Sequence, residues 1–350
     1  MIKVAFDVSP LKNENSHRGV GAYTRFLTEE LSKLSDIEVV DSKSKKADKD
    51  VSLIHYPYFD LFFPTLPLKL IHKTVVTIHD VIPLVFPKEY KVGKKGKLNF
   101  LRQLITLRTV NAIITDSEAS KKDIVKYLKV NEERVHVVYL APNPNLKSVS
   151  SEKSKEIKEQ YQIKNKYVLY VGDINYNKNI PQLIKMAKFL PDEVSLVCVG
   201  KNFYPHNIPE WEAIEVQIAI SNVSEKVIFI TDLGQDSDNK LSALYSGATA
   251  YVQPSLYEGF GLPVTEAMQC ETPVVCAKNS SLIEVGGDAV HFVEPNAESM
   301  ADGVKFILAL APFERSEMIK KAKKWVSQFS WTRTAHETAI IYRQLVDRNS

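Results

Sequence analysis

The sequence predicts an α/β fold of two doubly wound parallel sheets, and three observations carry this prediction. The 350 residues correspond to about two domains at roughly 150 residues each. A composition of 44% hydrophobic and 25% charged residues is typical of chains that bury cores. Short apolar runs alternate with helical stretches, and the runs are continuously apolar, as in strands that are covered on both faces.

The order of the apolar runs predicts one sheet in each half of the chain. In the first half we expect strands at residues 2–8, 51–55, 74–79, 112–115 and 135–139, with helices at 22–34 and 98–110. In the second half we expect strands at 167–171, 195–199, 227–230, 250–253, 273–277 and 290–293, with helices at 180–190, 239–245, 263–269 and 300–310. Ligands of such sheets bind at the carboxyl ends of the strands, so a cleft between the domains is the expected site.

A polar stretch separates the two sets of elements. Residues 145–166 are rich in serine, lysine and glutamate and are expected to hold the linker. This places a first domain over residues 1–150 and a second over 151–330. Residues 331–350 are expected to form a C-terminal helix that packs on the first domain, with Ser330 as its N-cap.

Composition excludes several classes of protein. The three cysteines, Cys198, Cys270 and Cys276, lie in apolar runs without metal-ligand spacing, which predicts buried thiols in a reducing compartment and no zinc site. The first residues lack the pattern of a signal peptide. No apolar run approaches the about 18 residues that a membrane-spanning helix needs, so a cytoplasmic protein without such a helix is expected.

Positive charge is concentrated in one segment of the first half. Residues 1–150 carry a net charge of +7 and residues 151–350 a net charge of −4. Such a segment fits an anionic membrane surface, where each cation contributes about 1 kcal/mol, or a solvated loop and helix face in which Gly93 and Gly96 indicate mobility. Nucleic acid is not an expected partner. Residues 86–109 hold one acid, Glu89, and seven cations: Lys88, Lys91, Lys94, Lys95, Lys97, Arg102 and Arg108.

Glycine is scarce, with 13 residues against about 24 at a usage of about 7%, so glycine pairs are informative. Gly19 and Gly21 follow the first predicted strand and precede a helix, which is the position of a phosphate-cradling turn. A GxGxxG fingerprint would need glycine where Thr24 stands, which disfavours a nicotinamide site.

A second glycine pair lies between two acids. Gly259 and Gly261 precede a helix with Pro263 in its first turn, and Glu258 and Glu266 bracket the segment. Carboxylates accept pairs of hydrogen bonds from vicinal hydroxyls, and helix-start amides bind phosphate or sugar oxygens. The residues alone therefore indicate a site for sugar and phosphate, or a helix start with an acid that favours the dipole.

The nine residues from Glu258 to Glu266, EGFGLPVTE, resemble the E-x7-E motif of the retaining GT-B glycosyltransferases of family 4. The implied fold is two Rossmann-like domains that face each other across a cleft. Residues 77–83 and 86–90 resemble the mannosyl- and rhamnosyltransferase branch of bacterial surface-polysaccharide assembly. The resemblance also covers residues 244–248, 252–255, 272–275 and 329–331, and more loosely 18–23, 77–80 and 115–118.

The resemblance implies a role for each matching residue. Glu266 would hold the ribose of the donor nucleotide, Glu258 the hydroxyls of the transferred sugar, and Lys178 the leaving diphosphate. His79 would reach the donor sugar from the first domain. Asn177 stands where the family commonly has arginine, so a second cation is missing or comes from elsewhere. The other implied donor-binding positions are Gly21, Gly172, Leu233, Gly259, Phe260, Gly261 and Leu262.

The implied reaction is transfer of a hexose, with retention, from a nucleotide diphosphate sugar to a glycan or lipid-linked acceptor. GDP-mannose is the first expected donor and a UDP sugar the next; no cofactor is expected. A lysine and helix amides stabilise the leaving diphosphate without a metal. The Asp-x-Asp sequence of Asp236 and Asp238 is accordingly expected to cap a helix that begins near Asn239.

Two alternatives to a transferase remain open. A UDP-sugar 2-epimerase on the same fold would bind a nucleotide sugar without an acceptor, although the complete E-x7-E segment argues against it. A non-catalytic subunit would keep the fold and assist a partner glycosyltransferase. His79 also has an alternative as a strand-end histidine with ordinary hydrogen bonds.

Overall fold

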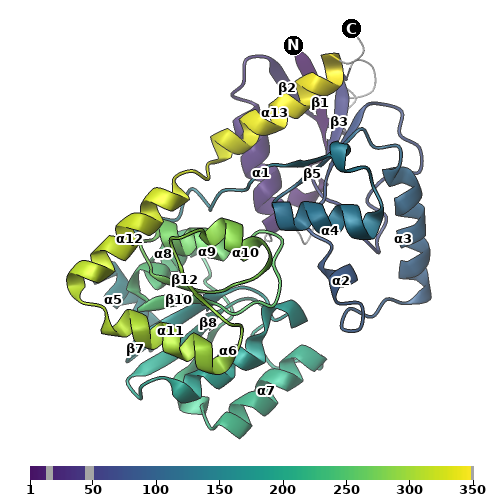
Figure 1. Ribbon diagram of the computed structural model, residues 1–350. Coiled ribbons are helices and arrows are strands. Elements are labelled where there is room, and N and C mark those ends of the chain that lie inside the picture. The colour runs from purple at the N-terminus through teal and green to yellow at the C-terminus, as the bar shows by residue number, and fades with distance from the viewer. Residues whose placement is uncertain (13–18, 44–50, 348–350) are drawn as a thin grey trace. The chain divides into compact units, whose positions relative to one another are not determined.

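The computed structural model describes residues 1–12, 19–43 and 51–347, and the chain divides into two compact units (Figure 1). The first unit comprises residues 1–141 and 329–350, and the second comprises residues 142–328. Each unit has one six-stranded parallel sheet. The predicted α/β fold with two doubly wound sheets is confirmed.

The first sheet has the strand order β2-β1-β3-β4-β5-β6. Its central strands β4 and β5 are buried at every residue, which explains their continuously apolar sequence. The edge strand β2 is only half-buried and has no continuously apolar run, so the sequence analysis did not predict it. The strands are β1 (Ile2–Phe6), β2 (Ile37–Asp41), β3 (Leu53–Tyr56), β4 (Thr74–Thr77), β5 (Ala112–Thr115) and β6 (Val135–Val137).

Two helices of the first unit start at serine caps. Ser117 Oγ accepts from the Ser120 amide at the start of α4, which the sequence did not predict. Ser330 Oγ accepts from the Arg333 amide, which confirms the predicted cap of α13. The helices are α1 (Gly19–Leu31), α2 (Ile82–Val85), α3 (Lys94–Leu107), α4 (Glu118–Leu128) and α13 (Trp331–Asp347).

Two expectations about glycines of the first unit were wrong. Gly19 and Gly21 lie in the first turn of α1 and do not form a turn before it, because the helix begins at Gly19. Gly93 is the N-cap of α3, and Gly96 lies inside this helix against the side chains of Val92 and Phe62. The basic segment is therefore helical from Lys94 onward, and no mobile glycine loop precedes Leu98.

A buried polar chain ties the C-terminal helix to the first sheet. Tyr342 of α13 shares a hydrogen bond of 2.5 Å with His55 Nδ1, and His55 Nε2 lies 2.8 Å from Thr77 Oγ1. Thr77 Oγ1 in turn lies 2.9 Å from the Tyr23 hydroxyl. Burial lowers the pKa of His55 to about 3, so the ring is neutral. These hydrogen bonds satisfy polar atoms that would otherwise be costly to bury.

The second sheet has the strand order β12-β11-β10-β7-β8-β9, so β7 lies beside β10. Chain order reverses at this pair, which is where a doubly wound sheet opens a crevice at the carboxyl ends of its strands. The strands are β7 (Lys166–Val171), β8 (Val194–Val199), β9 (Val227–Ile230), β10 (Ala250–Gln253), β11 (Val274–Ala277) and β12 (His291–Val293).

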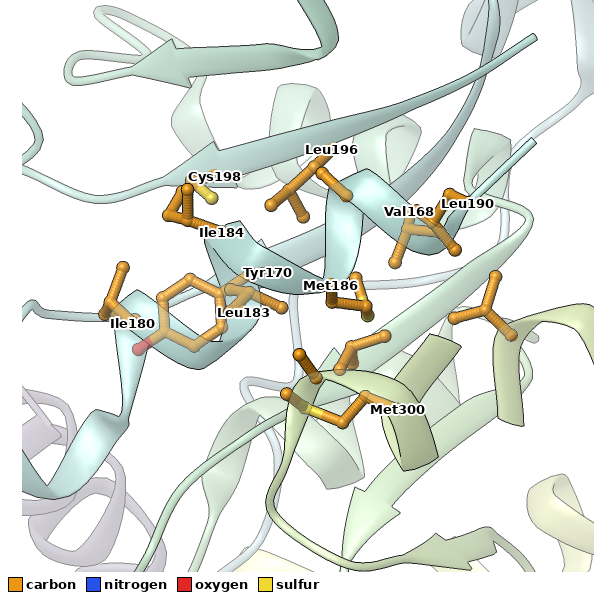
Figure 2. Packing of buried hydrophobic residues seen from close by; sticks show 14 of the residues in the cluster. Val168, Tyr170, Ile180, Leu183, Ile184, Met186, Leu190, Leu196, Cys198 and Met300 are labelled. Atoms are coloured by element: carbon orange, nitrogen blue, oxygen red, sulfur yellow. The ribbon is translucent and has the colours of Figure 1, made fainter. Parts of the chain in front are cut away.

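Helices on both faces cover the second sheet (Figure 1). Figure 2 shows part of the core, in which Leu183 and Ile184 of α6 belong to one cluster with Tyr170 and Cys198 of the sheet. All three cysteines are buried free thiols, as expected. The helices are α5 (Ser151–Gln160), α6 (Ile180–Met186), α7 (Pro209–Ser221), α8 (Ser237–Gly247), α9 (Leu262–Gln269), α10 (Ser280–Gly286), α11 (Ala297–Ala309) and α12 (Pro312–Val326).

The polar segment after Ala141 belongs to the second unit, so this unit starts at Pro142 and not at residue 151. Its backbone is bonded to helix side chains: the Val149 amide donates to Ser246, and Gln269 donates to the Asn143 carbonyl. Hydrogen bonds to backbone atoms cannot be recognised from composition, so the polar segment was predicted to be a linker. Within the described residues, every helix is too short or too polar to cross a bilayer.

Replacing Tyr342 by phenylalanine should lower the free energy of unfolding of the first unit by about 1–3 kcal/mol, because His55 Nδ1 would lose its partner in a fully buried position. Urea unfolding fitted with separate transitions for the two units measures this loss. Tyr204→Phe, at a tyrosine that is 48% exposed, is the control and should change stability by less than about 0.5 kcal/mol. An equally small effect at Tyr342 would contradict an anchoring role.

Candidate functional site

The loops that follow β7 and β10 meet at the carboxyl end of the second sheet. The first loop ends in a 3-10 turn over Tyr176–Lys178, and the second connects β10 to α9. Because β7 and β10 are neighbouring strands, residues 80 positions apart come into contact. Lys178 Nζ donates to both carboxylate oxygens of Glu258, at 2.7 and 2.8 Å.

Glu258 is 6% exposed, and most of its hydrogen bonds are to one carboxylate oxygen. Its Oε1 also accepts from Ser255 Oγ at 2.6 Å and from Gln253 Nε2 at 3.0 Å. Oε2 accepts from Lys178 alone among the described residues. Lys178 in turn has a third ammonium hydrogen beyond the two given to Glu258, and its side chain is 21% exposed. The pair therefore retains one acceptor position and one cationic donor.

Hydrogen bonds from α10 fix the backbone of the glycine loop. Ser280 Oγ accepts from the Glu258 amide at 2.9 Å. Ser281 Oγ is 2.9 Å from the carbonyls of both Glu258 and Phe260, and Phe260 itself is 4% exposed. Sequence reasoning missed both serines, because nothing in their spacing from the motif indicates that α10 lies beside it.

Gly261 is the residue that turns this loop into α9. Its φ of +105° lies in the left-handed region, and a Cβ would lie 2.8 Å from Leu282 Cδ2. Only glycine fits this position without strain. The buried Gly259 and the half-buried Leu262 complete the loop. At the start of α9, Pro263 has no N–H and the Val264 amide donates to the Gly261 carbonyl at 3.0 Å, so this turn offers fewer amides than an ordinary helix start. Its remaining amides are suitable donors for anionic or sugar oxygens.

Glu266 lies one turn further into α9, in surroundings that differ from those of Glu258. Tyr245 donates its hydroxyl hydrogen to Oε2 at 3.1 Å. Burial raises the pKa of Glu266 to about 7, although hydrogen bonds from Tyr245 and from the Asn143 backbone act in the opposite direction. Near neutral pH the side chain is thus poised between a carboxylic acid and a carboxylate.

The residues beside Lys178 have structural roles. Asn177 is 3% exposed and donates to the Tyr257 carbonyl at 2.9 Å, while its own carbonyl accepts from the Leu256 amide. Asn179, at a left-handed φ of +58°, donates to the carbonyls of Pro254 and Pro295. These asparagines fasten the two loops together. Asn177 therefore turns inward and contributes no charge.

The remaining predicted donor positions lie on neighbouring loops. Gly172 is half-buried and donates its amide to the Val199 carbonyl at 3.0 Å. Leu233 is half-buried, and its carbonyl accepts from Lys240 Nζ at 2.8 Å. This carbonyl, which backbone recognition of a base would use, therefore already has one donor.

Asp236 stands at the N-cap of α8, as the Asp-x-Asp prediction expected, but its side chain does not cap the helix. Helix α8 begins at Ser237, and the Asp236 side chain accepts from the Asn239 side chain and not from a helix amide. Asp238 accepts from the side chains of Asn143 and Asn145 and so ties the start of the second unit to α8. The described residues contain no group of three histidine, cysteine or acidic side chains placed to hold a metal ion.

His79 follows β4 in the first unit and is paired with Asp116, which follows the adjacent β5. His79 Nδ1 lies 2.7 Å from Asp116 Oδ2, and Nε2 lies 3.2 Å from the Pro57 carbonyl. Burial acts to lower the pKa of His79, but the carboxylate of Asp116 raises it above its ordinary value. The Asp116 partnership was not predicted, although Asp116 lies in the segment that resembles the family.

The donor contacts proposed for the first unit stay predictions. Gly21 is buried in the first turn of α1, and Arg18 of the same segment lies outside the described residues. His79 belongs to the first unit, and the Lys178–Glu258 pair to the second.

The raised pKa of Glu266 predicts a pH-dependent stability. The folded value of about 7 exceeds an unfolded value of about 4.3, so the folded state binds more protons between these values. The free energy of unfolding of the second unit should therefore fall as pH rises from about 5 to about 7. Urea unfolding of Glu266→Gln across this range should lack that decrease. The variant is needed for comparison because the raised pKa of His79 changes the stability of the first unit with pH in the same direction. Parallel pH curves would contradict the assignment.

Two family models match the chain, one in each half. The model described as Glycosyltransferase Family 4 matches residues 4–145, and the model described as Glycosyl transferases group 1 matches residues 153–325. Together they cover nearly all of both sheets.

Among characterised relatives, the O-antigen chain mannosyltransferase B of Escherichia coli is 28% identical over 288 residues, which is 80% of this chain and 72% of that protein. The O-antigen chain mannosyltransferase RfbU of Salmonella typhimurium is 27% identical over 75% of this chain and 71% of its own. The serotype-specific mannosyltransferase WbdA of Escherichia coli is 27% identical over 75% of this chain, but this match spans only 32% of that longer protein.

Solved structures have the same fold over the whole chain. Anabaena Alr3699/HepE, in complex with UDP and glucose, has a TM-score of 0.74 at 17% identity and covers 98% of this chain and 100% of its own. Sucrose-phosphate synthase from Thermosynechococcus elongatus has a TM-score of 0.67 at 21% identity over 97% of this chain and 82% of its own. With the E-x7-E loop, the two family models and the two parallel sheets in agreement, the chain belongs to the group 1 glycosyltransferases of family 4 and has their GT-B fold.

Proposed function

We propose that this glycosyltransferase moves a mannosyl residue, with retention, from a nucleotide diphosphate sugar to a glycan or lipid-linked acceptor in surface polysaccharide or glycolipid assembly. The observation that carries the proposal is the Lys178–Glu258 pair at the reversal point of the second sheet. The names of the mannosyltransferase relatives support mannose and make GDP-mannose the first donor. UDP in the HepE structure makes a UDP sugar the competing donor.

The pair has one unused acceptor position and one unused donor hydrogen, and these match the sugar and the diphosphate of such a donor. Glu258 Oε2 is the acceptor for a hydroxyl of the transferred sugar, while Ser255 and Gln253 hold Oε1 in place. Lys178 directs its third hydrogen to the diphosphate, and the amides of the α9 turn add neutral donors to the same anion. Glu266 as a carboxylate accepts from the ribose hydroxyls. For His79 we propose a contact with the donor sugar, with Asp116 fixing the orientation of the ring.

The proposed reaction breaks the bond between the anomeric carbon and the diphosphate oxygen and forms a bond from that carbon to the acceptor oxygen. The bond electrons leave with the diphosphate, where Lys178 and the loop amides stabilise the added charge. Positive character develops on the sugar as the leaving group departs, and the carboxylate of Glu258 favours it. The acceptor proton passes to the released diphosphate. We propose that no protein nucleophile, metal or other cofactor takes part.

A thermal-shift panel of UDP, GDP, dTDP and ADP with their sugars tests the donor class. A ligand at a hundredfold excess over its Kd should stabilise the folded protein by about 2.7 kcal/mol. We expect the largest shift with GDP and GDP-mannose, unchanged by EDTA. A shift with UDP alone would make a UDP sugar the donor in place of GDP-mannose. Loss of the shift in EDTA would contradict metal independence. No shift with any nucleotide would favour the non-catalytic subunit.

Removing either partner of the ion pair should lower kcat by about 10²–10³-fold, because each loses one charged contact with the transition state. Release of nucleoside diphosphate from the donor identified in the panel measures this for Glu258→Gln and Lys178→Gln. Lys185→Gln is the control, since Lys185 is a half-buried lysine of α6 that pairs with Glu298. Folding is checked by the melting temperature of each variant.

Wild-type turnover in both site variants would contradict the proposed site. Conversion of the donor sugar into its 2-epimer without net release of nucleotide would favour the epimerase. The anomeric configuration of the transferred sugar, read by NMR, tests retention separately.

A further inference from the structure

Helix α3 presents an apolar ridge to solvent, where a surface helix ordinarily presents polar residues. Leu98, Leu101 and Ile105 are 68%, 58% and 65% exposed, and their spacing of three and four residues places them on one face. The inward side of the helix buries Gln103, Thr106 and Leu107. We call Leu98, Leu101 and Ile105 the outer ridge.

The inward face of α3 is fixed by hydrogen bonds, so the outer ridge cannot turn inward. Gln103 Oε1 accepts from the amides of Thr65 and Leu66 at 2.9 and 3.2 Å, and its Nε2 donates to the Phe63 carbonyl. Asn99 donates to the Phe62 carbonyl at 2.9 Å. The loop held in this way carries Phe63, which is 71% exposed, beside the helix. In Figure 1, α3 lies along one side of the first unit.

Cations border the outer ridge on both sides. At 3.6 residues per turn, Lys97 and Arg108 lie on one side of it and Lys95 and Arg102 on the other, with Lys94 at the start of the helix. Residues 86–109 contain seven cations and one acid. An apolar strip between two rows of positive charge is the pattern of a helix that lies in the plane of an anionic bilayer surface.

We propose that α3 is a membrane-binding helix whose outer ridge inserts at the boundary of headgroups and acyl chains while the bordering cations contact anionic lipid. Charge alone is also compatible with a solvated face; the exposed aliphatic ridge adds a group that only an apolar phase stabilises. A second copy of the chain does not fit, because two such faces would bring like charges together. Nucleic acid does not fit, because aliphatic side chains offer bases no stacking surface.

Sedimentation with vesicles tests the proposal on the full chain. Wild-type protein should sediment with vesicles of phosphatidylglycerol and phosphatidylcholine at low salt, and much less with phosphatidylcholine alone. The Leu98→Ser/Leu101→Ser/Ile105→Ser variant should bind the anionic vesicles at least about tenfold more weakly. Val216→Ser/Ile220→Ser on α7, at aliphatic residues 59% and 69% exposed, is the matched control and should bind as wild type does.

Further variants separate the contribution of charge to vesicle binding from that of insertion. Lys94→Glu/Lys95→Glu/Lys97→Glu should likewise weaken sedimentation with anionic vesicles, and about 1 M salt should weaken wild-type binding, because the Debye length is then about 3 Å. A Leu101→Trp variant should show a blue-shifted emission on addition of anionic vesicles, relative to wild type. The melting temperature and the nucleotide-induced shift should be unchanged in every ridge variant, which keeps this test independent of the proposed donor.

Three results would overturn the proposal. The first is wild-type protein that stays in the supernatant with anionic vesicles at low salt. The second is a ridge variant that sediments as well as wild type, which would leave a purely electrostatic contact. The third is a wild-type dimer in light scattering that the ridge substitutions dissociate, which would make the outer ridge an interface between copies.

Discussion

The parallel pairing of β7 with β10 is the constraint on which the candidate site depends. These strands are neighbours in the sheet although β8 and β9 separate them in sequence. The loops that follow them therefore start at the same edge of the sheet, and Lys178 lies within hydrogen-bond distance of Glu258. The same pairing directs the start of α9 toward that edge, so charge, carboxylate and helix amides converge there.

An ion pair in such a position is costly to bury, and the surrounding hydrogen bonds show how the protein offsets this cost. Glu258 receives donors from Ser255 and Gln253 as well as from Lys178, and Ser280 accepts from its amide. The arrangement is asymmetric, because one carboxylate oxygen is nearly saturated and the other is not. In the proposed function, this asymmetry leaves the second carboxylate oxygen for a hydroxyl of the donor sugar. Glu266 shows the contrasting case, in which burial without a cation raises the pKa toward neutrality.

Two helices of the first unit are held by buried hydrogen bonds but differ in the surface that they leave exposed. Helix α13 buries the Tyr342 hydroxyl in a chain of hydrogen bonds that includes a neutral His55, and so binds the end of the chain to the sheet. Helix α3 buries the polar side chains of Gln103 and Thr106 beside Leu107, but leaves Leu98, Leu101 and Ile105 outside. Buried hydrogen bonds therefore set the orientation of each helix, and in α3 the result is an apolar surface.

The sequence by itself determined the class of fold, most strands, the burial of the cysteines, the cap at Ser330 and the Glu258–Glu266 segment. These are local properties: continuous apolar runs, short caps and motif spacing are all set by residues near one another. Only the tertiary structure decided the rest. The half-buried strand β2 has no continuous run, and α7 buries Ile214 but exposes Val216 and Ile220, so its apolar residues do not mark one face. Asn177 and Ser281 act through backbone carbonyls of other loops, and such bonds leave no pattern in sequence. Periodicity shows that Leu98, Leu101 and Ile105 share one face of α3, but whether that face meets the core or the solvent depends on which partners the opposite face finds.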